Sequence, residues 1–225
     1  MDEGQVILLP GEAVPSTLLP PTRKGVLTLG PGLRHVMPSE IISTTAGTLN
    51  KNDKKGATWL EFESGRYVPT LGDLVVAQIH HGATDQYYCM LAPHTSNAVL
   101  GHLAFEGANR KTRPQLKSGD VVYARVCRAV KGEDVEIECV NSATGKSDGL
   151  GPLKGGMIFN VSLAYARGLM APGENDATAM LQALGEKISF EIAVGRNGLI
   201  WLNGADVKTT LSIGKALTDA DQRKA

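Results

Sequence analysis

The chain has 225 residues, a net charge of zero and 42% hydrophobic residues, which is the composition of a folded globular protein. A neutral chain has no global attraction for nucleic acid, so any contact with RNA has to come from a local patch. The three widely spaced cysteines, Cys89, Cys127 and Cys139, fit neither a Cys-x-x-Cys metal site nor a disulfide framework. No apolar run approaches membrane-spanning length, so we expect no membrane contact.

The first 65 residues are rich in Gly, Pro and Thr, and their apolar runs are short. None of these runs shows a sustained helical period, and turn-forming residues separate them. The runs are Val6–Leu9, Val26–Leu29, Ile41–Ile42 and Trp59–Phe62. We therefore predict a small β-rich N-terminal domain over residues 1–65, with strands too short to be stable alone.

Residues 66–145 change character and carry five short strand-like runs. Two of them open with Gly-Asp, at Gly72 and at Gly119. Each Asp is predicted to complete a turn by accepting from nearby backbone N–H groups, rather than to form a catalytic carboxylate pair. The predicted strands cover 72–79, 87–91, 97–103, 119–126 and 135–140. Five short strands at this spacing predict a small barrel of the OB type.

The last part, residues 146–225, alternates strands and helices. Residues 141–156 are predicted to form a Gly/Ser-rich connector. The predicted elements that follow are a strand over 157–161, a helix over 163–170, a helix ending at 184, strands over 188–194 and 199–202, and a helix over 206–220. The order β-α-α-β-β-α predicts an α+β domain with a helix-covered sheet.

The segment Gly195-Arg196-Asn197-Gly198 has the letters of the GxxG loop with which KH domains clamp a nucleic-acid backbone. Its flanks are strand-like, however, and Asn-Gly between apolar strands is a strong hairpin signal. We therefore predict a structural turn, with Gly195, Asn197, Gly198 and the core residue Trp201 holding the last domain against the barrel.

Positive charge gathers between Gly107 and Lys131. Seven cations and one acid leave that stretch with a charge of plus six; the cations are Arg110, Lys111, Arg113, Lys117, Arg125, Arg128 and Lys131, and the acid is Asp120. Since OB barrels bind oligonucleotides with one face and its loops, we predict that Arg110, Lys111, Arg113 and Lys117 contact RNA phosphates. The alternative is a solvated loop.

Two adjacent pairs of ring side chains are further candidates. Tyr87 and Tyr88 alternate across one strand, so one of them is predicted to face outward. His80 and His81 have no third metal ligand at useful spacing, so we predict a loop position, with protonation adding charge toward RNA. We expect no metal, no cofactor and no catalytic residue, since neither a Ser/His/Asp order nor a phosphate-binding Gly loop occurs.

Several motifs, taken in order, resemble one family. Gly72-Asp73-x-Val75 and Gly119-Asp120-x-Val122 resemble an S1 RNA-binding domain. Together with the motifs listed next, they are similar to the S1/KH cap subunits of the eukaryotic RNA exosome, closest to the ribosomal RNA-processing protein 40 type. These motifs are Arg66-Tyr67-Val68-Pro69, Phe105-Glu106-Gly107-Ala108, Arg113-Pro114 and Gly195-x-Asn197-Gly198-x-Ile200-Trp201.

The resemblance implies three modules: an N-terminal β domain (1–65), an S1 barrel (66–145) and a KH-like domain (146–225). It implies a non-catalytic subunit that holds the RNase-PH-like ring together with other cap subunits and guides single-stranded RNA to an associated 3′–5′ exoribonuclease, in nucleus, nucleolus and cytoplasm. The alternatives are another S1/KH protein (a sister cap subunit or a translation-associated one), an RNA-processing enzyme with accessory S1/KH modules, and an assembly protein without RNA contact.

Overall fold

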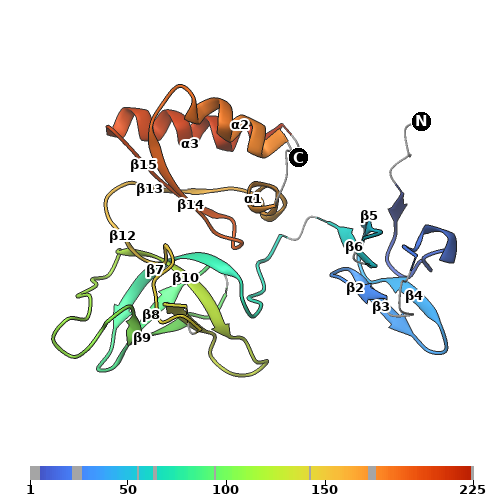
Figure 1. The fold of residues 1–225 in the computed structure, drawn as a ribbon, viewed down its shortest axis with the longest axis horizontal. Coiled ribbons are helices and arrows are strands. Elements are labelled where there is room, and N and C mark those ends of the chain that lie inside the picture. Colours follow the sequence, from blue (N-terminus) through green and yellow to red (C-terminus); the bar gives the residue numbers. More distant parts are fainter. Residues whose placement is uncertain are drawn as a thin grey trace. The chain divides into compact units, whose positions relative to one another are not determined.

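In the computed structural model the chain divides into two compact units, Met1–Ser64 and Gly65–Ala225, the second of which is the larger (Figure 1). The described residues are 6–21, 27–54, 56–62, 65–93, 95–141, 143–171 and 176–223. Of the predicted strand Val26–Leu29, Val26 lies outside the described residues, and the strand there is β2 (Thr28–Leu29).

The first unit is β-rich, as predicted. It contains β1 (Ile7–Leu8), a 3-10 turn η1 (Ser16–Leu18), β2, β3 (Leu33–Val36), β4 (Glu40–Ser43), β5 (Gly47–Asn52) and β6 (Ala57–Glu61). A four-stranded sheet has the order β1-β5-β6-β2, and β3 and β4 form a separate hairpin. The small core contains Leu8, Val14, Ile41 and Leu60.

The second unit begins with a closed five-stranded barrel, which confirms the OB-type prediction. Its strands are β7 (Leu74–Gly82), β8 (Gln86–Met90), β9 (Ala98–Phe105), β10 (Val121–Arg128) and β11 (Glu136–Cys139). The sheet runs β11-β9-β8-β7-β10, and the additional pairing of β11 with β10 closes it. The pairing of β9 with β11 is parallel, whereas the others in the barrel are antiparallel.

Alternation along the strands fills the barrel. Side chains such as Val75, Ala77 and Ile79 on β7 point inward and are fully buried, as period-two patterning requires. Cys89 and Cys139 belong to the same core, and burial raises the pKa of the Cys89 thiol to about 12. These thiols are free and act as small apolar core side chains.

The segment 141–156 is more than the connector that we predicted. Its residues Gly151–Leu153 form β12, which pairs antiparallel with Val121–Tyr123 of β10. Because the segment is rich in Gly and Ser, and β12 itself has Pro152 as its middle residue, its sequence has no strand pattern. The strand forms because the edge of β10 is available for pairing.

The last part has the predicted order β-α-α-β-β-α. Its elements are β13 (Met157–Asn160), α1 (Leu163–Met170), α2 (Asp176–Gly185), β14 (Phe190–Val194), β15 (Leu199–Gly204) and α3 (Val207–Gln222). Two helices start at side-chain caps: Ser162 Oγ accepts from Tyr165 N at 3.1 Å, and Asp206 Oδ1 accepts from Thr209 N at 2.6 Å. The sheet order is β13-β15-β14.

The central strand β15 is covered on both faces. Ile200 and Leu202 pack with Ile213 and Leu217 of α3, whereas Trp201 packs with Val76 of the barrel. Figure 1 shows α2 and α3 on one side of this sheet and the barrel on the other. Burial on both faces explains why residues 199–202 are wholly apolar instead of alternating.

Candidate nucleic-acid interface

The segment between β9 and β10, residues 106–120, is called the basic loop below. It is an ordered turn built around Asn109, whose Oδ1 accepts from Lys111 N at 2.8 Å and from Thr112 N at 3.0 Å. Thr112 Oγ1 closes the turn by donating to Gly107 O at 3.0 Å. These bonds leave Arg110 and Lys111 exposed at the tip, with no side-chain ion pair to any described residue.

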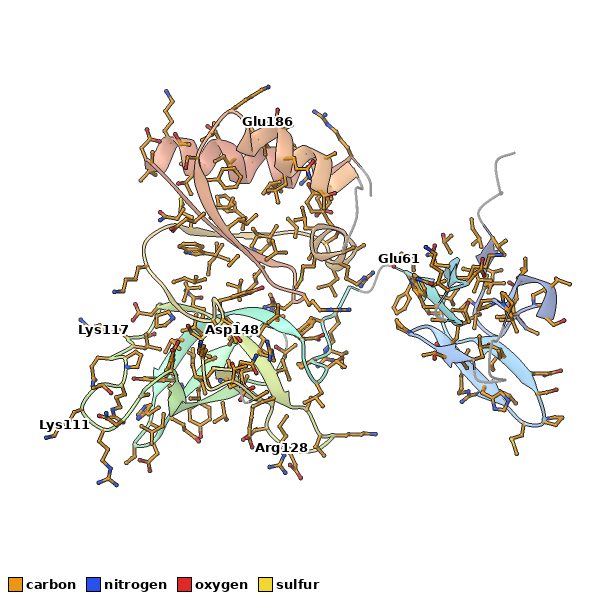
Figure 2. The ribbon with its side chains drawn as sticks, viewed as in Figure 1. Glu61, Lys111, Lys117, Arg128, Asp148 and Glu186 are labelled. Atoms are coloured by element: carbon orange, nitrogen blue, oxygen red, sulfur yellow. The ribbon has the colours of Figure 1, made fainter. Side chains whose placement is uncertain are left out.

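The other cations of the plus-six stretch do not join that tip. Arg128 forms ion pairs with Glu133 and, at 3.3 Å, with Glu136, both of which follow the stretch in sequence. Arg125 stands directly opposite Glu138 in the ladder between β10 and β11. Figure 2 shows Lys111 and Lys117 on one side of the barrel and Arg128 on the other. The stretch is therefore divided into an unpaired basic tip and a neutralised region.

Two ring side chains of the barrel, Tyr87 and His102, hold the base of the basic loop. The buried Tyr87 donates its hydroxyl to Pro114 O at 2.9 Å and accepts from Leu116 N at 3.3 Å. Arg113 turns inward and contacts His102 Nδ1 with its guanidinium. Of the predicted phosphate ligands, Arg113 is thus partly buried, whereas Arg110, Lys111 and Lys117 are exposed.

The Gly-Asp turns behave as predicted. Asp120 Oδ2 accepts from Lys117 N at 2.7 Å, and Asp73 Oδ2 accepts from Thr70 N at 3.1 Å. Each carboxylate thus bonds the backbone three residues earlier, which is the geometry of a turn. The hydroxyl of Tyr67 also donates to Asp73 Oδ2, at 2.9 Å. Both carboxylates have structural roles in the fold.

We predicted a loop position for His80 and His81, but they lie at the end of β7. The register between β7 and β8 shifts between Ile79 and His81, and this irregularity lets the two neighbouring rings meet. Their Nδ1 atoms are 2.8 Å apart, and both side chains are exposed. Such a contact needs one donor and one acceptor, so one of the two Nδ1 atoms carries the shared proton.

Tyr88 is the tyrosine that faces outward. The ring of His81 stacks on it with centroids 4.6 Å apart, while Tyr87 points into the barrel. Two apolar side chains are also exposed nearby: Met90 of β8 is 42% exposed and Leu103 of β9 is 57% exposed. The face of β7, β8 and β9 therefore offers the exposed rings of His80 and His81, which are suited to stacking with bases of single-stranded nucleic acid, next to exposed apolar side chains.

The Gly195–Gly198 turn joins β14 to β15 and is buried against the barrel. The amide of Asn197 is 5% exposed; its Nδ2 donates to Val76 O at 2.8 Å and also to Leu91 O, and its Oδ1 accepts from Val76 N at 3.3 Å. A Cβ at Gly195 would lie 2.6 Å from Val76 N. Gly198 has a φ of 78°, which side chains rarely adopt.

Neighbouring side chains extend this contact. Trp201 is buried and donates from Nε1 to Gly155 O at 2.9 Å, and Tyr123 of β10 donates its hydroxyl to Val194 O at 3.1 Å. Arg196 projects outward and pairs with Asp73 Oδ1 at 3.3 Å. The turn thus has the letters of an RNA clamp but is occupied by contacts with the barrel.

Sequence reasoning missed the pairing of His102 with Arg113, because a histidine in a strand is not expected to be buried. The stack of His81 on Tyr88 was missed because it depends on the register shift. Among the described residues no three His, Cys, Asp or Glu side chains are grouped closely enough to hold a metal ion. None of the described helices is long and apolar enough to cross a membrane.

A closed S1-type barrel followed by a β-α-α-β-β-α module defines a class of RNA-binding proteins, and three family models agree with this division. Residues 67–151 match the S1 domain of exosome complex component RRP40, and residues 27–66 match the N-terminal domain described as exosome complex exonuclease Rrp40. Residues 156–208 match a KH domain.

Similar curated proteins match over nearly the whole chain. The exosome complex component rrp40 of Schizosaccharomyces pombe is 37% identical, over 94% of this chain and 87% of its own length. RRP40 of Drosophila melanogaster is 36% identical, over 99% of this chain and 92% of its own length. RRP40 of Saccharomyces cerevisiae is 34% identical, over 96% of this chain and 89% of its own length. The chain therefore belongs to the RRP40 family of exosome complex components.

A solved structure supports the same assignment. The crystal structure of a candidate exosome complex RNA-binding protein superposes with a TM-score of 0.55 and is 26% identical, covering 69% of this chain and 86% of its own.

Proposed function

We propose that the chain is a non-catalytic, RNA-binding cap subunit of the RNA exosome. The observation that carries this proposal is its membership of the RRP40 family over almost its full length. The barrel with its unpaired basic tip supplies the physical means to bind RNA, because exposed Arg and Lys side chains neutralise phosphates without regard to sequence. The chain supports RNA processing and decay by other subunits.

RNA and the exosome complex are the partners. Within the complex the chain contacts the RNase-PH-like ring and the other cap subunits and delivers single-stranded RNA to an associated 3′–5′ exoribonuclease. It acts in the nucleus and the cytoplasm, and also in the nucleolus. Its domains are residues 1–65, 66–145 and 146–225. The third of these domains contributes β12, which pairs with β10 at the edge of the barrel sheet.

The RNA interface consists of the exposed tip of the basic loop and the outer face of the barrel. Arg110, Lys111 and Lys117 supply phosphate contacts, while His80 and His81 add an exposed ring surface. Arg113 belongs to this interface through the loop that it anchors.

The Gly195–Gly198 turn has a structural role in this proposal. The buried amide of Asn197, the close approach at Gly195, the positive φ of Gly198 and the buried ring of Trp201 support it. Together they hold the KH-type module on the barrel, so the RNA contact lies elsewhere.

The test is a fluorescence titration of the reconstituted complex with labelled single-stranded RNA. R110A/K111A removes two charges from the basic tip and should weaken binding about tenfold at low salt, since each exposed ionic contact is worth up to about 1 kcal/mol. The matched control is R128A/K131A, which removes the same charge at the end of β10, where Arg128 is paired with Glu133 and Glu136.

The control variant should bind RNA almost as the parent does. Equal affinities of R110A/K111A and the parent complex would contradict the proposed interface. Failure of the chain to enter the complex would contradict its role as a cap subunit.

A further inference from the structure

His102 is an unusual core residue of the barrel. It is only 6% exposed, and its ring lies 4.3 Å from that of Tyr87 at an angle of 52°. Its Nδ1 contacts the guanidinium of Arg113 in the basic loop. His102 Nε2 and Arg113 Nε are buried and have no hydrogen-bond partner among the described residues. A polar pair has therefore been taken out of water at the base of the exposed cationic tip.

The charge state of this pair follows from its chemistry. Arginine is always a charged donor, so His102 Nδ1 has to be an unprotonated acceptor. The groups that face the imidazole are Arg113, the ring of Tyr87, Asp85 in the turn between β7 and β8, and Gln86 at the start of β8. Burial and the Arg113 charge lower the pKa of His102, and these effects outweigh the Asp85 charge and the Gln86 backbone, which raise it. The net lowering favours the neutral acceptor.

Arg113 transmits this anchor to the tip. Its backbone N donates to Asn109 O at 2.9 Å, and the side chain of Asn109 holds the backbone N–H groups of Lys111 and Thr112. Fixing the guanidinium of Arg113 therefore fixes the turn that displays Arg110 and Lys111. A preorganised loop loses less conformational entropy when it binds.

We propose that His102 is a positioning residue for RNA binding: it does not touch RNA but, as a neutral acceptor for Arg113, holds the basic tip in its binding conformation. This inference rests on the proposed function, because it assumes that Arg110 and Lys111 contact RNA. In this role Arg113 acts through the loop and is not itself a free phosphate ligand.

The test compares H102A in two backgrounds of the reconstituted complex, by titration with labelled single-stranded RNA. In the parent background H102A should weaken binding roughly three- to tenfold. In the R110A/K111A background it should have little further effect, because the groups that it positions are gone. H102N, whose amide oxygen takes the place of Nδ1, should restore most of the affinity.

The outcomes are distinguishable. If R110A/K111A itself binds RNA normally, the proposed interface is wrong. If R110A/K111A weakens binding but H102A does not, or H102A weakens it equally in both backgrounds, His102 has no positioning role. Should H102A fail to fold or assemble, the comparison of H102N with H102L decides, since only the former keeps the acceptor; equal affinities of these two would overturn the proposal.

Discussion

Two segments of this chain have features of nucleic-acid-binding loops, and they are used in opposite ways. The Gly195–Gly198 turn has the letters of a KH clamp, yet its Asn197 is buried and bonded to the barrel backbone. The basic loop has no nucleic-acid clamp motif, yet it holds Arg110 and Lys111 in solvent, without ion pairs to any described residue. Burial and pairing therefore favour the basic loop over the Gly195–Gly198 turn as the proposed RNA contact.

The same contrast holds for charge. Arg196 in the turn pairs with Asp73, and Arg128 in the barrel pairs with Glu133 and Glu136, so both are partly neutralised. Among the described residues, no acid forms an ion pair with Arg110 or Lys111 at the tip of the basic loop. The comparison predicts that changes in the turn affect stability, whereas changes at the tip affect RNA affinity.

The largest effect is expected from N197A in the turn. It leaves the backbone groups of Val76 and Leu91 without their side-chain partner inside a buried contact. The loss should be about 2–4 kcal/mol of unfolding free energy, measured by urea denaturation of the full chain. RNA affinity of the assembled complex should change far less than stability.

N203A is the matched control for N197A, because the side chain of Asn203 donates to the exposed Glu191, at 3.2 Å, instead of to buried backbone groups. It should cost well under about 1 kcal/mol. If N197A folded and assembled normally but lost RNA binding, the turn would be a clamp after all.

Acid should weaken the barrel through His102. Because burial and Arg113 lower its pKa, the unfolded chain binds a proton more readily than the folded one. The stabilising contribution is therefore complete above about pH 6.5 and is lost as the pH falls below that value. The urea midpoint should fall more between pH 7.5 and 5.5 in the parent than in H102N; an equal fall would show that His102 is not responsible.

The smallest effect is expected from R196A. Its ion pair with Asp73 is half exposed, so its removal should cost less than about 1 kcal/mol. RNA affinity in the assembled complex should stay within about twofold of the parent by fluorescence titration. A tenfold loss in R196A would favour the clamp interpretation.

Much of the fold could be predicted because local patterns coincide with tertiary burial. Alternation marked the five barrel strands, Asn197-Gly198 marked the hairpin, and the Gly-Asp pairs marked turns that the structure confirms. In contrast, β5 and β12 are polar or contain Gly and Pro, and β3 is only four residues long, so none has a strong strand pattern. They form by pairing with β6, β10 and β4, respectively.

The site was harder to predict, because its properties depend on how side chains pair in the folded state. The charge of Arg128 is offset by Glu133 and Glu136, which lie just beyond the basic stretch, and His102 meets Arg113 because the basic loop folds back onto β9. His81 reaches Tyr88 through a register shift that no local pattern signals.

The central claim is that RNA is contacted by the basic loop and not by the Gly195–Gly198 turn. The most direct test is the salt dependence of RNA affinity for the assembled complex. In R110A/K111A the slope of log affinity against log salt should become shallower by about 1.4, the value for two lost phosphate contacts on a single strand, while R196A should keep the parent slope. An unchanged slope in R110A/K111A, with a shallower one in R196A, would contradict the account.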